Sequence, residues 1–93
     1  MEVEEAVLSS GLAREAACVV IADRDGFERL ALFIVPDAHA KGLARQFAEQ
    51  QLPLILPRHS QPKWIRELDD LPRTPTGKVQ RFRLRQMLEV EED

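Results

Sequence analysis

A lysine at position 78 is the residue whose surroundings best suit chemistry. The loop around it contains two prolines, two threonines and a glycine: Pro72, Thr74, Pro75, Thr76 and Gly77. Prolines stiffen such a loop, and a glycine lets the backbone come close to a ligand. A lysine at the tip of a stiff loop can deliver one point charge to an anion. The segment therefore predicts an anion-binding tip that depends on Lys78.

The Gly77-Lys78 pair invites comparison with the phosphate-binding loop of nucleotide hydrolases. That motif needs Gly, four residues, and then Gly-Lys-Ser/Thr. Here Pro72 occupies the first glycine position and Val79 follows Lys78, so the sequence excludes the motif. Without further context, a solvated surface lysine would be the simpler interpretation.

Residues 71–85 closely resemble the last conserved motif of the adenylate-forming superfamily, which includes acyl- and aryl-CoA synthetases, peptide-synthetase adenylation domains and luciferases. The motif runs Pro-Lys/Arg-Thr-x-x-Gly-Lys-Ile/Val-x-Arg. The residues that fit it are Pro72, Arg73, Thr74, Gly77, Lys78, Val79 and Arg81. Residues 2–4 and 16–20 look like the segment after the family's hinge, and residues 62–65 look like its approach to the third strand. Residues 77–85 are most similar to benzoate-CoA-ligase-like enzymes.

This resemblance implies that residues 1–93 are the mobile C-terminal domain of an acid–CoA ligase. Such an enzyme uses ATP and Mg²⁺ to convert a carboxylic acid to an acyl-adenylate, and the thiol of coenzyme A then displaces AMP. The resemblance makes Lys78 the catalytic lysine of the first step, on a loop with Thr74, Thr76 and Gly77. An ammonium there would stabilise the negative charge that gathers as the carboxylate meets the α-phosphate.

The resemblance implies two further roles. After the small domain rotates for the second step, Lys63, His59 and Trp64 are expected near coenzyme A. Lys78 also resembles the acetylation site of the family, so a lysine acetyltransferase and a deacetylase are expected partners. Acetylation would remove the charge on which the first step depends.

The family's hinge motif, a Gly-Arg-x-Asp stretch, and its large N-terminal domain have no counterpart in these 93 residues. We therefore expect a fragment whose main partner is its own large domain. ATP, Mg²⁺ and the acid would bind mainly to that missing domain, and the isolated chain would fold without catalysing. The usual His-Pro after the first helix is replaced by Ser10-Gly11, which should alter only a turn.

Hydrophobic patterning predicts an α+β fold. Two short β-branched runs on either side of an Asp-Gly turn indicate an antiparallel hairpin. Pro53, Pro57 and Pro62 should end the second helix and leave an irregular crossing before an edge strand. The result is a small three-stranded sheet, a hairpin plus an edge strand, packed with about three helices. Helices are expected over 2–9, 39–52 and 80–89, and strands over 16–22, 30–35 and 63–68.

Charge is unevenly distributed although the net charge is only −3. Five cations and no acid lie between positions 72 and 88, and acids follow at 89, 91, 92 and 93. A local cationic surface beside an acidic tail suits one phosphate better than a long polyanion, so nucleic-acid binding is disfavoured. Arg81 and Arg85 share a helical face, which we interpret as a solvated or salt-bridged stripe facing the tail acids or the missing domain.

The remaining candidate residues have structural interpretations. Cys18 lies in an apolar run and is expected in the core, and a single cysteine permits no internal disulfide. Trp64 is expected to be a core or interface anchor. His39 and His59 have no ligand partners at metal-binding spacing, so no metal site is assigned. Ser9 and Ser10 look like cap or turn residues. The acidic N-terminus and the lack of a long apolar run favour the cytoplasm and no membrane association.

Two alternatives remain at this point. The basic loop and helix could form a noncatalytic module that binds RNA or an acidic protein, with an affinity that weakens with salt. Within the superfamily, the chain could instead come from a peptide-synthetase adenylation domain. If Asp93 is the true C-terminus, no carrier-protein domain follows, which favours a stand-alone ligase. The sequence does not identify the acid.

Overall fold

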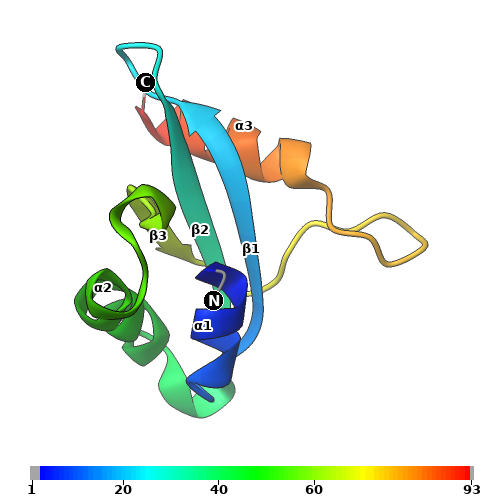
Figure 1. Cartoon of the computed structure of the whole chain (residues 1–93). Helices are drawn as coiled ribbons and strands as arrows, with labels where there is room; N and C mark the ends of the chain where they lie inside the picture. Colours follow the sequence, from blue (N-terminus) through cyan, green and yellow to red (C-terminus); the bar gives the residue numbers. More distant parts are fainter. Residues whose placement is uncertain (1–2, 93) are drawn as a thin grey trace.

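A three-stranded sheet forms the centre of the domain (Figure 1). The computed structural model describes residues 3–92. The strands are β1 (Ala13–Ala22), β2 (Glu28–Pro36) and β3 (Trp64–Glu67), in the order β1-β2-β3. β1 is antiparallel to β2, and β3 is parallel to it. The predicted hairpin and third edge strand are confirmed, and both hairpin strands are longer than predicted.

The turn between β1 and β2 is organised by Asp23. Its carboxylate accepts the N–H groups of Asp25 at 2.9 Å and Phe27 at 3.0 Å. Gly26 has a φ of +85°, a conformation that L side chains rarely adopt. The Asp-Gly sequence therefore makes the turn that was predicted from it, and the Asp23 side chain fixes its shape.

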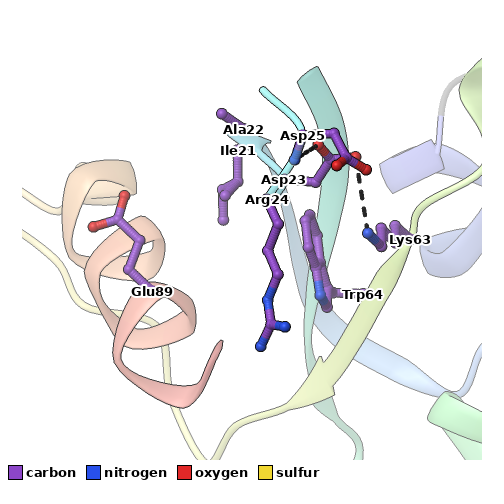
Figure 2. A pocket seen from close by; sticks show the side chains of 8 residues that line it. All are labelled: Ile21, Ala22, Asp23, Arg24, Asp25, Lys63, Trp64 and Glu89. Carbon is purple, nitrogen blue, oxygen red and sulfur yellow. Dashed lines mark hydrogen bonds and ion pairs between the residues drawn. The ribbon is translucent and has the colours of Figure 1, made fainter. Parts of the chain in front are cut away.

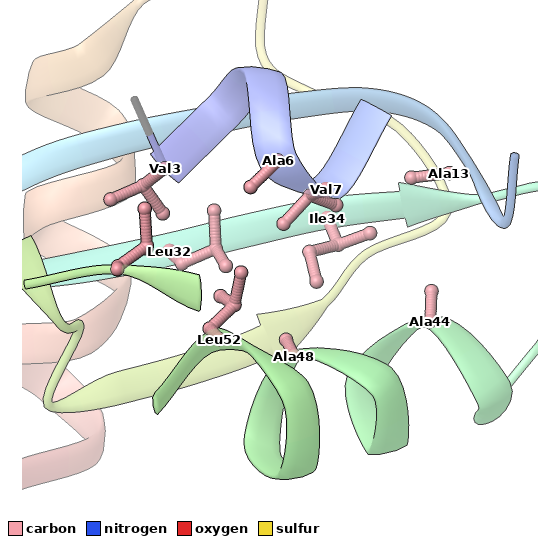
Figure 3. Packing of buried hydrophobic residues seen from close by; sticks show 10 residues of the cluster. Val3, Ala6, Val7, Ala13, Leu32, Ile34, Ala44, Ala48 and Leu52 are labelled. Carbon is pink, nitrogen blue, oxygen red and sulfur yellow. The ribbon is translucent and has the colours of Figure 1, made fainter. Parts of the chain in front are cut away.

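Helices α1 (Val3–Ser9) and α2 (Leu43–Ile55) cover one face of the sheet. Figure 3 shows Leu32 and Ile34 of β2 pointing toward residues of both helices. The helical residues buried in this cluster are Val3, Ala6, Val7, Ala44, Ala48 and Leu52. Small alanines at the contact let α2 lie close to the sheet.

Helix α3 (Arg81–Glu92) covers the opposite face. Its buried residues Leu84 and Leu88 belong to a second cluster with Phe33, Trp64 and alternate residues of β1. The central strand is therefore buried on both sides. This explains why residues 31–35 form an uninterrupted apolar run instead of alternating with polar residues.

Helix α2 differs from its predicted range of 39–52. A short 3₁₀ turn occupies Ala38–Ala40, and the helix continues past Pro53 to Ile55. Pro53 lies in the last turn of the helix, so the N–H group that proline lacks removes one hydrogen bond only near the helix end. After it, Leu56 N–H still donates to Leu52 O at 2.9 Å. The prediction that Pro53 would end the helix was therefore wrong by three residues.

The start of α2 is capped from a distant strand. Glu67 of β3 accepts the N–H groups of Gly42 at 2.8 Å and Arg45 at 2.9 Å. Gly42 has no side chain for this purpose, so the carboxylate supplies acceptors for two otherwise unpaired helix donors. A partner 25 residues away in sequence leaves no local signal.

Cys18 is only partly buried, although a core position was predicted. It packs against the first cluster, and its N–H donates to the Glu4 carboxylate at 2.7 Å. Burial, and secondarily the nearby Glu4 charge, raise the pKa of the Cys18 thiol to about 11. The thiol therefore stays protonated and poorly nucleophilic at neutral pH.

Other structural expectations have mixed outcomes. Trp64 is confirmed as a core residue, with 7% of its surface exposed. Ser10 is confirmed as a turn residue, because its hydroxyl donates to Val7 O at 2.6 Å and accepts Leu12 N–H at 3.1 Å. The predicted helix start at Glu2 and the side chains of the tail acids 91–93 lie outside what the structure describes. Over residues 3–92, no helix has the length and apolar character to cross a membrane.

Candidate functional site

The Lys78 loop is a tight turn closed by its own backbone. Arg73 and Val79 face each other in an antiparallel bridge. Thr74 N–H donates to Lys78 O at 2.8 Å, and Gly77 N–H donates to Thr74 O at 2.9 Å. Gly77 has a φ of +90°, so the turn ends in a left-handed residue that strongly favours glycine. The spacing of the motif is thus required by the shape of the loop.

The two threonine hydroxyls point into the loop. Thr74 Oγ1 accepts Lys78 N–H at 3.1 Å and lies 2.9 Å from Thr76 Oγ1. These groups hold the backbone on the N-terminal side of Lys78. The Lys78 side chain is exposed, and its ammonium has no ion pair or hydrogen bond among the described residues. The loop therefore presents a charge that no neighbour engages.

Both ends of the loop are attached to the core. Leu71 is buried in the second cluster, and Val79 packs against it. Gln80 N–H donates to Pro72 O at 2.8 Å, which closes the base of the loop. In Figure 1 the loop projects from the body of the domain between β3 and α3. A firm base and an exposed tip suit delivery of Lys78 to a ligand held elsewhere.

Lys63 and Trp64 form a second group, at the turn between β1 and β2. Lys63 Nζ lies 4.9 Å from the centroid of the Trp64 ring and 3.9 Å from Asp23 Oδ2. These residues line a cavity of about 410 Å³ together with Ile21, Arg24 and others (Figure 2). The Lys63 ammonium is thus in cation–π and electrostatic contact with its surroundings.

Asp23 is the centre of this second group. Its carboxylate also accepts Arg29 Nε–H at 3.1 Å. Desolvation acts to raise the pKa of Asp23, but hydrogen bonds from Phe27, Arg29 and Asp25 and the Lys63 charge outweigh it and hold the pKa below its ordinary value. Asp23 therefore remains ionised and keeps two cations beside the turn.

His59 lies in a neighbouring hollow. It is exposed in the 3₁₀ turn Arg58–Ser60 and lines a hollow of about 250 Å³ with Arg29 and Arg58. Arg29 of this hollow pairs with Asp23, which lines the Figure 2 cavity. The structure therefore places Lys63 with Trp64 and Asp23, and places His59 in a separate hollow. Lys78 lines neither hollow.

The arginine stripe of α3 contacts β1. Arg81 Nη1 donates to Cys18 O at 3.0 Å and lies 3.5 Å from the Glu4 carboxylate. Arg85 Nε donates to Val20 O at 3.1 Å. The interpretation of this face as salt-bridged is confirmed for Arg81, but the contacts are with α1 and β1. A sequence pattern can show that two arginines share a face without showing what that face meets.

The described chain offers no donor set suited to a resident metal. Among residues whose side chains are described, no three His, Cys, Asp or Glu groups are arranged to hold an ion.

The described residues form a small α+β domain with the Gly77-Lys78 loop between β3 and α3. The chain belongs to the AMP-binding enzyme C-terminal domain family, whose model matches residues 2–78. The match ends on Lys78. This membership confirms the resemblance seen in residues 71–85.

The relatives include aromatic acid–CoA ligases. The chain is 36% identical over 91 residues to the 3-hydroxybenzoate–CoA ligase of Aromatoleum sp. (strain CIB), covering 96% of this chain and 17% of that protein. It is 38% identical over 87 residues to the benzoate–CoA ligase of Thauera aromatica, covering 91% and 16%. The crystal structure of Brucella canis acyl-CoA synthetase matches with a TM-score of 0.80 and 31% identity, over 98% of this chain and 17% of that one. The chain thus spans about one sixth of their length.

Proposed function

We propose that this chain serves as the C-terminal domain of an ATP-dependent acid–CoA ligase of the aryl-acid type and supplies its catalytic lysine. The observation that carries the proposal is the exposed, unengaged ammonium of Lys78 at the tip of a loop fixed at its base. Family membership and the aromatic acid–CoA ligases among its relatives support the reaction class. The relatives described above favour this function over a noncatalytic binding module or a peptide synthetase.

Lys78 acts in the adenylation step. As the carboxylate of the acid approaches the α-phosphate of ATP, negative charge concentrates between them, and the ammonium lowers the energy of that arrangement more than that of the separated reactants. Thr74, Thr76 and Gly77 shape the loop that holds Lys78 in place. We assign the binding of ATP, Mg²⁺ and the acid mainly to the large domain, which corresponds to most of the relatives' length outside this chain.

Lys63 acts in the second step, close to the phosphates or pantetheine of coenzyme A. Lys63 lines the Figure 2 cavity, and Arg29 and Arg58 add positive charge around the separate hollow that His59 lines. Trp64 is too buried to stack on a ligand with its full ring. Its part is to support Lys63 through the ring face, while His59 reaches the ligand from the 3₁₀ turn Arg58–Ser60.

The main partner is the large domain of the same enzyme. An open groove of about 860 Å³ lies beside α3. Its apolar lining residues are Phe33, Leu68, Phe82 and Met87, and its polar ones are Arg66, Glu67, Arg83 and Gln86. Phe82 is 52% exposed and Met87 is 43% exposed. Exposed apolar side chains of this size commonly mark a contact surface. Since the chain spans about one sixth of its relatives, the remainder of the enzyme is the occupant that fits.

Two attributes complete the proposal. The enzyme works in the cytoplasm, where ATP and coenzyme A are available as substrates. A lysine acetyltransferase modifies Lys78 and a deacetylase restores it, which the exposed side chain permits. Mass spectrometry after treatment with an acetyltransferase and acetyl-CoA should find acetyl-Lys78, and an unmodified Lys78 would remove this part of the proposal.

The decisive experiment is Lys78→Ala in the full-length enzyme. Adenylation, followed as acid-dependent pyrophosphate release, should fall by about two orders of magnitude or more, since an electrostatic group of this kind contributes on that scale. Thioester formation from a pre-made acyl-adenylate should be largely spared. Lys41→Ala, at another exposed lysine, is the matched control. Equal losses in both half-reactions would contradict the role of Lys78.

The noncatalytic alternative makes a different prediction. The 93-residue chain would bind RNA or an acidic protein by itself, and the affinity would weaken steeply as salt is added. We expect no such binding. Fluorescence anisotropy with a labelled single-stranded RNA at low and physiological salt separates the two functions.

A further inference from the structure

The side chain of Arg73 connects the Lys78 loop to the sheet. Its Nη1 donates to Gly77 O at 2.8 Å across the loop, and its Nη2 forms an ion pair with Glu15 of β1. The Glu15 side chain is 23% exposed and that of Arg73 is 37% exposed. One guanidinium thus spans from a strand of the core to the residue immediately before Lys78.

The peptide plane between Gly77 and Lys78 is held at both of its polar atoms. Its oxygen accepts from Arg73, and its N–H donates to Thr74 Oγ1. This plane needs such support, because Gly77 has a positive φ and, apart from its chain neighbours, no atom lies within 4 Å of the place where a Cβ would stand. Fixing the plane fixes the direction in which the Lys78 side chain leaves the backbone.

Glu15 is placed for this contact by an irregularity of β1. The pairing register with β2 shifts between Ala13 and Glu15. Such irregularities bend a strand and redirect its side chains. The hydrogen bonds of Thr74 connect residues within the loop. The Arg73–Glu15 ion pair instead connects the loop to strand β1 of the sheet.

We infer that Glu15 is a positioning residue for Lys78, acting through Arg73. This inference rests on the proposed function of Lys78 in adenylation. Glu15 fixes the position of the Arg73 guanidinium through the ion pair, and the guanidinium in turn fixes Gly77 O through a hydrogen bond. The orientation of the Gly77–Lys78 peptide plane then sets the direction of the Lys78 side chain. Because the Arg73–Glu15 pair is partly exposed and screened by water, it contributes little to the free energy of folding. Its main effect is to fix the geometry of the loop. Small misplacements of a catalytic group lower a rate strongly.

The test compares Glu15→Gln and Arg73→Lys in the full-length enzyme. Glu15→Gln removes the charge with little change in shape, and Arg73→Lys keeps a cation that cannot bridge both partners. Both should lower the rate constant of adenylation about tenfold, with the KM for ATP unchanged and thioester formation from acyl-adenylate unchanged. Glu49→Gln is the matched control, because it breaks the exposed Arg45–Glu49 pair on α2.

A second measurement reports on the loop itself. In the 93-residue chain, Glu15→Gln should speed hydrogen exchange of the Lys78 amide about tenfold, while the amides of β2 keep their protection. Normal adenylation in Glu15→Gln, with a large loss in Lys78→Ala, would overturn the positioning inference alone. Normal adenylation in Lys78→Ala would overturn the proposed function and the inference with it. An unchanged exchange rate for the Lys78 amide would also contradict the positioning inference.

Discussion

Lys78 and Lys63 are both exposed lysines, but their surroundings engage them to different degrees. The Lys78 ammonium has no partner among the described residues, and its loop is shaped by contacts of the backbone, two threonines and Arg73. Lys63 lies beside the Asp23 carboxylate and over the Trp64 ring. In the proposed function, the Lys78 charge that acts on a transition state is left free, whereas the Lys63 charge that holds a ligand is kept in one place by its neighbours.

The strongest test of the difference between the two lysines is Lys63→Ala in the full-length enzyme. The KM for coenzyme A should rise about tenfold, as expected when one charge-assisted contact to a phosphate is lost. Adenylation should be unchanged, the opposite of the pattern for Lys78→Ala. Lys41→Ala again serves as the control. Steady-state kinetics with coenzyme A as the varied substrate measures the effect, and an unchanged KM would remove Lys63 from the coenzyme A site.

Gly26→Ala and Gly77→Ala compare the backbones of the two regions. Both glycines have positive φ, and a Cβ would meet nothing within 4 Å at either, so only the conformation resists alanine. Gly26→Ala should lower the free energy of unfolding by about 1 kcal/mol, because its turn joins two core strands. Gly77→Ala should lower the free energy of unfolding by less, since the loop can change conformation without disturbing the core. Urea unfolding of the 93-residue chain checks both, and equal losses would contradict the independence of the loop.

Asp23→Asn should give the smallest effect and one that depends on pH. The folded pKa of Asp23 is depressed, so its stabilising contribution is present above the unfolded pKa of about 3.9 and is lost as the pH falls through the folded value. Wild type should therefore be more stable than Asp23→Asn at neutral pH, and the difference should shrink below about pH 4. Urea titrations at several pH values measure it. A difference that persists in acid would assign the effect to packing.

Sequence patterns predicted those parts of the domain whose structure is determined by residues close together in sequence. The Asp-Gly turn, the apolar run of β2 and the spacing of the Lys78 loop all follow from residues close in sequence. The cap on α2 from Glu67 and the Arg73–Glu15 pair could not be predicted in this way. Each joins segments brought together only by the fold.

The predicted site residues lie together in the structure where one short motif contains them. Lys78, Thr74, Thr76 and Gly77 lie together because they are neighbours in sequence. The second group was predicted as Lys63, His59 and Trp64, but its centre is Asp23, which was seen only as a turn residue. The local signal that could have found it is an aspartate at the end of an apolar strand with Arg29 across the turn, whereas Lys63 joins this pair only through the fold.

The contacts of Arg81 and Arg85 have a consequence for solubility. β1 is an edge strand, and a free edge presents backbone acceptors on which another chain could add a strand. The two guanidinium groups occupy the oxygens of Cys18 and Val20, and Glu4 occupies the N–H of Cys18. With its acceptors occupied and positive charge beside them, the edge discourages strand-to-strand aggregation between molecules.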